Sequence, residues 1–148
     1  MSSTLHASAV LAGAWAVLIR GPAGAGKSQL TLDLLDAAAA GLLRFGRLVA
    51  DDRAHLEIAH GRLLVRPAES LEGLIEVRGL GIRRLAFEPI AVVGLVVDLA
   101  ADDGARLPTP PAMTFRFGGV TLPRVAVAPG AEPLHIVLAA LRTAEWRQ

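Results

Sequence analysis

The sequence predicts a single α/β domain in which apolar strands and helices share one core. A short apolar run at residues 14–20 leads through a glycine-rich turn into a helical pattern at residues 28–40. Residues 90–99 (IAVVGLVVDL) form a stronger apolar run, typical of a strand buried on both faces. With 148 residues and 53% hydrophobic residues, the chain has the size of one domain and can bury a core without disulfides.

The helical pattern at residues 28–40 places Leu30, Leu34 and Leu35 on one face, and Gly41 favours a helix end directly after it. We expect further strands at residues 48–50, 90–99, 114–117 and 120–127, and a hairpin of residues 55–59 and 62–66 that turns at His60 and Gly61. One helical turn is expected at residues 69–73 and a helix at residues 133–146. Residues 74–82 are expected to form a shaped loop with two glycines, and residues 100–111 an acidic, proline-rich loop.

Charge and cysteine content exclude several classes of protein. The formal net charge is +1 and no block of like charge is present, so we expect no nucleic-acid partner. The chain has no cysteine, which excludes disulfides and thiolate metal sites. Residues 1–15 carry no basic residue, unlike a secretory signal, and no apolar run reaches the roughly 20 residues of a membrane span. A cytoplasmic protein without a membrane partner is expected.

Residues 21–28 (GPAGAGKS) match the phosphate-binding pattern GxxxxGK[ST] and stand between the predicted strand and helix, as that pattern requires. Such a loop turns backbone N–H groups toward phosphate, with Lys27 reaching the β- and γ-phosphates and Ser28 offering its hydroxyl to Mg²⁺. Lys27 is the only lysine, beside 14 arginines. The alternative is a glycine-rich loop that binds nothing. The expected nucleotide-binding residues are Gly21, Pro22, Ala23, Gly24, Ala25, Gly26, Lys27 and Ser28.

Two adjacent carboxylates, Asp51 and Asp52, follow the predicted strand at residues 48–50. A phosphate loop needs a carboxylate near its metal ion, usually at the end of a neighbouring apolar strand, and either residue fits. The pair suggests that one carboxylate supports the metal while the other takes a proton from an attacking hydroxyl. A solvated turn is the alternative for Asp52.

Three motifs in order resemble those of the HPr kinase/phosphorylase family. They are GPAGAGKS at residues 21–28, ADDR at residues 50–53 and EVRGLGI at residues 76–82, and the resemblance runs from about residue 6 to residue 127. It implies a P-loop, PEP-carboxykinase-like nucleotide-binding domain with a mixed β-sheet and flanking helices. It also implies that residues 1–148 form a single catalytic domain.

The resemblance further implies an ATP- and Mg²⁺-dependent kinase that phosphorylates a serine of the phosphocarrier protein HPr and can remove that phosphate by phosphorolysis. Asp52 would be the proton acceptor, and Glu76 would join Ser28 and Asp51 around Mg²⁺. His6 would lie near the moving phosphate and set the protonation of Asp52. Arg106 matches a catalytic arginine through its Arg-Leu pair. The family's hexamers imply a homo-oligomer.

The chain also departs from the family pattern. Family members commonly carry a separate N-terminal domain, and we expect a short form without it. The segment used for dephosphorylation corresponds to residues 128–133 (APGAEP), which has no basic residue and leaves the reverse reaction open. Arg78, Arg83 and Arg84 are expected to meet phosphate or an acidic partner, or to be solvated. Two other functions stay open, a small-molecule kinase and a nucleotide-sensing module without transfer activity.

Overall fold

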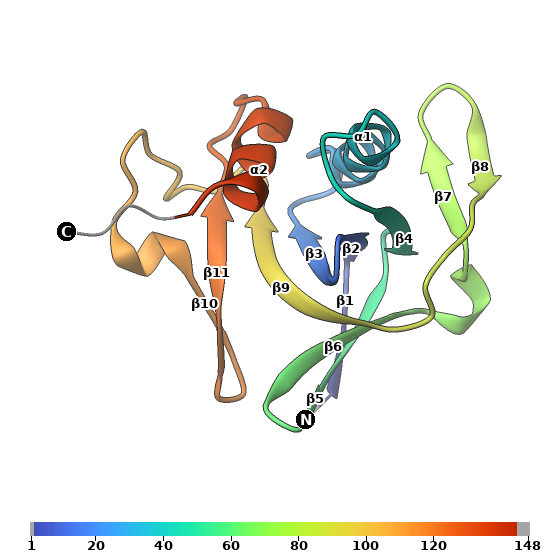
Figure 1. Ribbon diagram of the computed structural model, residues 1–148, viewed down its shortest axis with the longest axis horizontal. Coiled ribbons are helices and arrows are strands. Elements are labelled where there is room, and N and C mark those ends of the chain that lie inside the picture. Colours follow the sequence, from blue (N-terminus) through green and yellow to red (C-terminus); the bar gives the residue numbers. More distant parts are fainter. Residues whose placement is uncertain (1, 145–148) are drawn as a thin grey trace.

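The computed structural model describes residues 2–144, which form a curled nine-stranded sheet, a separate hairpin and two helices (Figure 1). The strands are β1 (Ser2–Leu5), β2 (Ala7–Ala12), β3 (Trp15–Arg20), β4 (Gly46–Ala50), β5 (Ala54–Ala59), β6 (Arg62–Pro67), β7 (Leu74–Val77), β8 (Gly81–Arg84), β9 (Ala91–Asp98), β10 (Thr114–Phe117) and β11 (Val120–Ala126). The helices are α1 (Lys27–Ala39) and α2 (Pro133–Arg142), with short 3₁₀ turns η1 (Glu69–Leu71) and η2 (Pro110–Met113).

Strand β9 lies at the centre of the sheet. The main strand order is β1-β5-β6-β9-β3-β2-β4, and β10 joins through β11, which also pairs with β9. β9 runs parallel to β3 and β11 and antiparallel to β6, so the sheet is mixed. The two helices lie next to each other over one face of it (Figure 1). The predicted α/β class, with a mixed sheet and flanking helices, is confirmed.

The central strands are buried on both faces, as their uninterrupted apolar runs predict. In β3, Ala16 and Leu18 belong to the core enclosed by the curl of the sheet, whereas Val17 and Ile19 belong to the core under the helices. This alternation follows from the two-residue period of a strand. The phosphate-loop motif is therefore attached to a strand with no free face.

Helix α1 packs as its pattern predicts. Leu30 and Leu34 are fully buried, whereas Leu35 is only partly buried. The helix ends at Ala39 with Ala40 as its C-cap, Gly41 follows with φ +83°, and the Leu42 N–H donates to the Ala37 carbonyl at 2.9 Å. This bond and the left-handed glycine are those of a Schellman cap, so the predicted helix end is confirmed.

Three segments differ from expectation. Strands β1 and β2 occupy residues 2–12, for which no element was predicted, and residues 74–84 form a β-hairpin where a loop was expected. Helix α2 ends at Arg142 instead of residue 146, and residues 145–148 lie outside the described part of the chain. Within residues 2–144, no helix is both long and apolar enough to cross a membrane.

Candidate active site

The glycine-rich loop at residues 21–28 connects the end of β3 to the start of α1. Gly24 and Gly26 have φ of +82° and +101°, a left-handed backbone that L side chains rarely adopt. No atom lies within 4 Å of a Cβ built on either residue, so conformation and not space requires glycine there. Gly26 is the N-cap of α1, and the first turn of the helix has no acidic residue. The loop and the unpaired N–H groups of that turn suit an anion.

Lys27 begins α1, and its side chain folds back over the loop. Its Nζ donates hydrogen bonds to the carbonyls of Gly21 at 2.9 Å and Pro22 at 3.3 Å. The residue is only 8% exposed, although the loop before it is largely exposed. Lys27 is the only lysine in the sequence, and these hydrogen bonds hold its ammonium group within the loop.

Asp51 is buried and joins three elements. One of its carboxylate oxygens, Oδ1, accepts hydrogen bonds from Ser28 Oγ at 2.6 Å and from Ser8 Oγ at 2.9 Å. The other, Oδ2, accepts from the backbone N–H of Glu76 at 3.1 Å. Asp51 therefore fixes the Ser28 hydroxyl and draws the start of α1, strand β2 and strand β7 together.

Asp52 is exposed where Asp51 is buried. Its φ is +65°, a left-handed conformation that is unusual outside glycine and often marks functional positions. Two hydrogen bonds hold the Asp52 backbone in this conformation. The Asp52 N–H donates to Ser8 Oγ at 3.2 Å, and the Asp52 carbonyl accepts from the Ala7 N–H at 3.1 Å. Its neighbourhood is a cavity of about 470 Å³, lined by Ala23, Gly24, Gly26, Lys27, Ser28, Gln29, Leu32, Asp52, Glu76 and Arg78. One cavity thus collects the loop, the lysine and two carboxylates.

Comparison with known proteins agrees with this geometry. The family described as HPr Serine kinase C-terminal domain matches residues 1–87, more than half of the 148 residues. The chain belongs to this family. An HPr kinase/phosphorylase from Halalkalibacterium halodurans is 36% identical over 99 residues, which is 62% of this chain and 30% of that relative. The chain therefore matches under a third of the length of this curated relative.

A solved structure supports the same HPr kinase fold over nearly the whole chain. The HPr(Ser) kinase/phosphatase from Coxiella burnetii superposes with a TM-score of 0.74 at 25% sequence identity. The match covers 95% of this chain and 94% of the other. The likeness thus extends well past residue 87, through β9, β10, β11 and α2.

Several predicted site residues are not among those that line the cavity. They are Gly21, Pro22 and Ala25 of the loop, the buried Asp51, and His6 and Arg106, which the HPr kinase resemblance suggested. His6 occupies the exposed bend between β1 and β2, and its neighbour Ala7 donates its N–H to the Asp52 carbonyl. The backbone thus brings His6 close to Asp52 although they are far apart in sequence. Arg106 lies in the exposed loop between β9 and η2 and makes no side-chain hydrogen bond to any residue within 2–144.

The residues present fit an Mg²⁺ ion bound together with phosphate. Ser28 and Glu76 line the cavity, and Asp51 holds the Ser28 hydroxyl from behind. Within residues 2–144 no three His, Cys, Asp or Glu side chains are grouped as a metal site. Mg²⁺ suits such a sparse set, because proteins usually bind it through one or two carboxylates plus substrate phosphates and water.

Ser8 is a site residue that the sequence prediction missed. It is fully buried on β2, where its hydroxyl donates to Asp51 and accepts from the Asp52 N–H. A polar residue inside the alternating segment ASAVLA was the available signal. Its partners could not be assigned without knowing that β2 pairs with β4.

An ion-pair network supports the entry to the loop. Arg20, directly before Gly21, donates to both carboxylate oxygens of Asp98 at 2.7 Å, and Arg124 donates to the same carboxylate at 2.6 Å. Burial acts to raise the pKa of Asp98, but the hydrogen bonds from Arg20 and Arg124 outweigh it and hold that pKa below its ordinary value. The ends of the parallel strands β3, β9 and β11 are thereby tied together.

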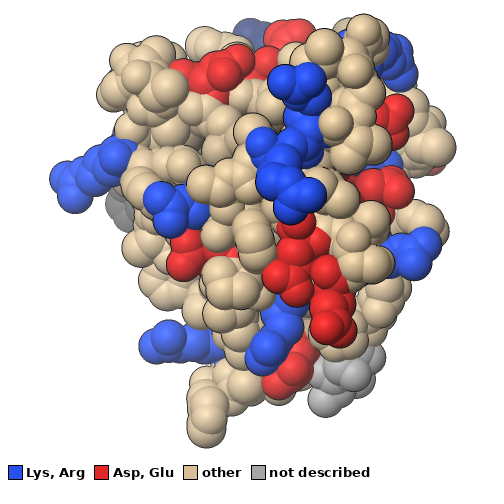
Figure 2. All heavy atoms as spheres, turned by 90° about the vertical axis from the view of Figure 1, so that its right-hand side faces the viewer, with Lys and Arg blue, Asp and Glu red and all other residues tan. Residues whose placement is uncertain are grey.

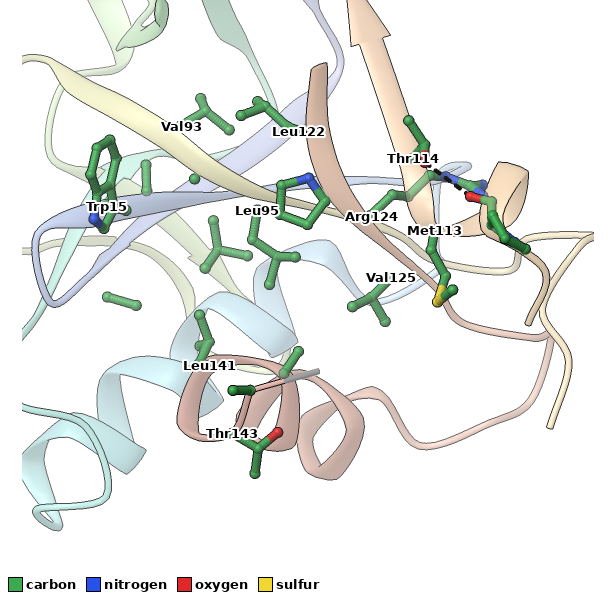
Figure 3. Close-up of a pocket in the computed structure, with 18 residues that line it drawn as sticks. Trp15, Val93, Leu95, Met113, Thr114, Leu122, Arg124, Val125, Leu141 and Thr143 are labelled. Carbon is green, nitrogen blue, oxygen red and sulfur yellow. Dashed lines mark hydrogen bonds between the residues drawn. The ribbon is translucent and has the colours of Figure 1, made fainter. Parts of the chain in front are cut away.

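A second, larger cavity of about 960 Å³ lies between the sheet and α2 (Figure 3). The side chains drawn there are mainly apolar and include Trp15, Leu95, Val125 and Leu141. Among the residues from 2 to 144, no carboxylate lines it, and its arginine, Arg124, is engaged by Asp98 and Asp103. It has no groups suited to phosphate transfer, so the smaller cavity is the candidate active site.

Proposed function

We propose that this domain transfers the γ-phosphate of ATP to a serine of an HPr-like phosphocarrier protein, using Mg²⁺. The observation that carries the proposal is the common cavity of Lys27, Ser28, Asp52 and Glu76 beside the glycine-rich loop. The family match and the two similar proteins, an HPr kinase/phosphorylase and an HPr(Ser) kinase/phosphatase, support the same substrate. In this proposal residues 1–148 act as one catalytic domain.

Residues 21–28 bind the phosphates of ATP in this proposal. The left-handed glycines and the start of α1 supply N–H donors and partial positive charge, and Lys27 supplies a full positive charge. Ser28 and Glu76 hold Mg²⁺, with Asp51 supporting the serine. When bound, the ion supplies positive charge that offsets the charge on the phosphates.

Asp52 acts as the general base. Its carboxylate takes the proton of the acceptor serine hydroxyl as the serine oxygen bonds to the γ-phosphorus and the bond to the bridging oxygen of ADP breaks. Exposure at the cavity lets Asp52 meet a hydroxyl carried by another protein, which buried Asp51 cannot do. His6 adjusts the protonation of Asp52, and Arg106 stabilises charge on the transferred group.

Incubation with a purified HPr-like protein and labelled ATP tests the proposal, with the phosphorylated residue located by mass spectrometry. We expect phosphoserine only when Mg²⁺ is present. Turnover of a metabolite without labelling of protein would replace the proposal with a small-molecule kinase. ATP binding without transfer to any acceptor would replace it with a nucleotide sensor.

Three further proposals have tests of their own. Adding inorganic phosphate to the phosphorylated acceptor and measuring pyrophosphate tests whether the site also runs phosphorolysis, the reaction that the relatives' names indicate. Sedimentation velocity tests the homo-oligomer, a hexamer by family resemblance. Cell fractionation tests a cytoplasmic location.

A further inference from the structure

The β7–β8 hairpin borders the candidate active site but stands apart from the main sheet (Figure 1). Its register pairs Glu76 with Ile82, and directly paired residues of antiparallel strands lie on the same face. Glu76 lines the cavity. Ile82 is therefore on the face of the hairpin that carries a cavity residue.

Two large apolar side chains of this hairpin are uncovered. Leu80 is 62% exposed and Ile82 is 63% exposed, more than most apolar side chains of this chain. Single exposed apolar residues are ordinary, but two together at the rim of a polar cavity favour a contact with another molecule. Gly79 and Gly81, with φ of +84° and +103°, shape the turn, and the Leu80 N–H donates to the Val77 carbonyl at 2.9 Å. The hairpin thus presents both side chains on a defined turn.

Two arginines accompany this apolar pair. Arg84 pairs with Leu74, on the same face of the hairpin as Glu76 and Ile82, and Arg78 begins the turn. Both are exposed, and within residues 2–144 neither forms an ion pair. Arg83 pairs with the buried Ile75 and therefore lies on the opposite face. Figure 2 views the side of the molecule on which the hairpin lies, where basic side chains are spread over the surface and one group of them near the centre lies directly above a group of acidic side chains. Within residues 2–144, β8 pairs with no strand except β7, so its outer edge keeps free backbone groups.

We infer that these four residues (Arg78, Leu80, Ile82 and Arg84), the acceptor ledge, dock the protein that receives the phosphate. This inference rests on the proposed function. The partner that fits carries an exposed apolar side chain next to its acceptor hydroxyl, for Leu80 and Ile82, and carboxylates that face the arginines. Docking there brings the hydroxyl to Asp52, because Glu76 and Arg78 belong to both the ledge hairpin and the cavity lining.

A second copy of the chain fits this surface less well. A two-fold contact between two ledges would bring the arginines of both copies together, and like charges oppose such a contact. The nucleotide is also not the occupant, since the proposal assigns its phosphates to residues 21–28. An acidic protein surface has the complementary charge.

Steady-state transfer to the HPr-like protein tests the ledge. We expect Ile82→Ser and Leu80→Ser each to raise the KM for the acceptor about tenfold, with ATP affinity and kcat at saturating acceptor unchanged. Arg84→Glu should raise that KM further at low salt and less at 0.5 M salt, because screening weakens the attraction. Ile136→Ser on α2 and Arg62→Glu at the β5–β6 turn are matched controls with exposed side chains, and both should keep the wild-type KM.

The outcomes separate the ledge from the proposed function. If the wild-type protein transfers no phosphate, the proposed function is wrong. Calorimetric measurement of acceptor binding to the wild type and the variants then still tests the ledge. If the wild type transfers phosphate and Ile82→Ser and Arg84→Glu keep the wild-type KM and acceptor binding, the ledge alone is excluded. A loss of oligomer mass in those variants with the acceptor KM unchanged reassigns the surface to subunit contact.

Discussion

Asp51 and Asp52 are neighbours in the chain, yet their carboxylates lie in different surroundings. Asp51 is 6% exposed and accepts three hydrogen bonds, whereas Asp52 lies at the cavity on a left-handed backbone. The left-handed residue Asp52 lies between β4 and β5, where the chain bends but keeps its direction along β2 and β1, and one carboxylate is buried while the next stays exposed. The buried carboxylate of Asp51, which accepts three hydrogen bonds, suits the positioning of other groups, whereas the exposed carboxylate of Asp52 suits proton transfer.

We predict that Asp52→Asn removes transfer and preserves nucleotide binding. The amide cannot take the serine proton, while Lys27, Ser28 and Glu76 remain. General-base catalysis contributes roughly 100- to 10,000-fold, so the barrier should rise by about 3–5 kcal/mol. Single-turnover transfer and nucleotide titration measure both quantities, and normal turnover by this variant would remove Asp52 from the mechanism.

Asp51→Asn should behave differently. The amide nitrogen cannot accept hydrogen bonds, so at least one of the Ser8, Ser28 and Glu76 donors loses its partner. We expect the free energy of unfolding to fall by about 1–3 kcal/mol and Mg²⁺-dependent nucleotide affinity to weaken. Urea denaturation and titration of ATP with and without Mg²⁺ measure the two effects. Unchanged ATP affinity with Mg²⁺ would show that Asp51 does not support the metal site.

Lys27→Ala should abolish transfer and leave the fold intact. Within residues 2–144, Nζ bonds to no groups except two carbonyls of its own loop, so the fold described there does not depend on it. Loss of its charge should lower the rate at least about 100-fold. Circular dichroism and thermal melting check the fold, and wild-type turnover by this variant would contradict the assignment of residues 21–28.

At the scale of elements, the predictable parts were those with strong local signals. The apolar runs that became β3 and β9, the helix over Leu30 and Leu34, and the turn at His60 and Gly61 follow from local pattern. β1 and β2 were missed because the small, mildly polar residues 2–12 have little strand propensity of their own and gain it by pairing with β5, β3 and β4.

The candidate site follows the same division. The phosphate-loop motif and the Asp51–Asp52 pair were apparent from sequence, while the family resemblance supplied Glu76 and His6. Ser8 depends on strand pairing between segments about 40 residues apart, which no local pattern encodes. Arg20 with Asp98 is another such case, since parallel pairing of β3 and β9 brings them together.

Ser8→Ala tests this long-range link. It removes a donor to Asp51 and an acceptor for the Asp52 N–H. The free energy of unfolding should fall by about 1–2 kcal/mol, because the Asp51 carboxylate loses one of its three donors and the Asp52 N–H loses its side-chain acceptor. Ser70→Ala, at an exposed serine of η1, is the matched control and should change stability little. Equal stability of the two variants in urea would show that the Ser8 bonds contribute nothing.

At the scale of the whole molecule, Asp98 joins the three parallel strands at the edge where the loop begins. Its pKa in the folded protein lies below the ordinary value, so its ionised form stabilises the fold. Because the folded pKa is depressed, this stabilisation is complete above the unfolded pKa of about 3.9 and disappears as the pH falls through the lower, folded pKa.

We therefore predict that Asp98→Asn lowers the free energy of unfolding at pH 7 by about 1–3 kcal/mol and that the difference from wild type shrinks below about pH 4. Arg124 keeps Asp103 and the Ala112 carbonyl as partners, which limits the loss. Urea denaturation at pH 7, 5, 4 and 3 measures it. Asp102→Asn, an exposed neighbour, is the control, and a pH-independent difference would exclude the carboxylate as its source.

The central place of β9 has a consequence for how the protein is made. The loop, both aspartates and Glu76 all precede residue 77, but the strand that pairs with the inner edge of β3 is β9, at Ala91–Asp98. During synthesis, the nascent chain therefore carries every proposed metal and phosphate ligand before the loop has its supporting neighbour. Until β9 emerges, β3 offers an open apolar edge of the kind that aggregates, and its closure is a slow, non-local step. In a chain released before residue 98, β3 would lead into the phosphate loop without a complete β9 paired to its open edge.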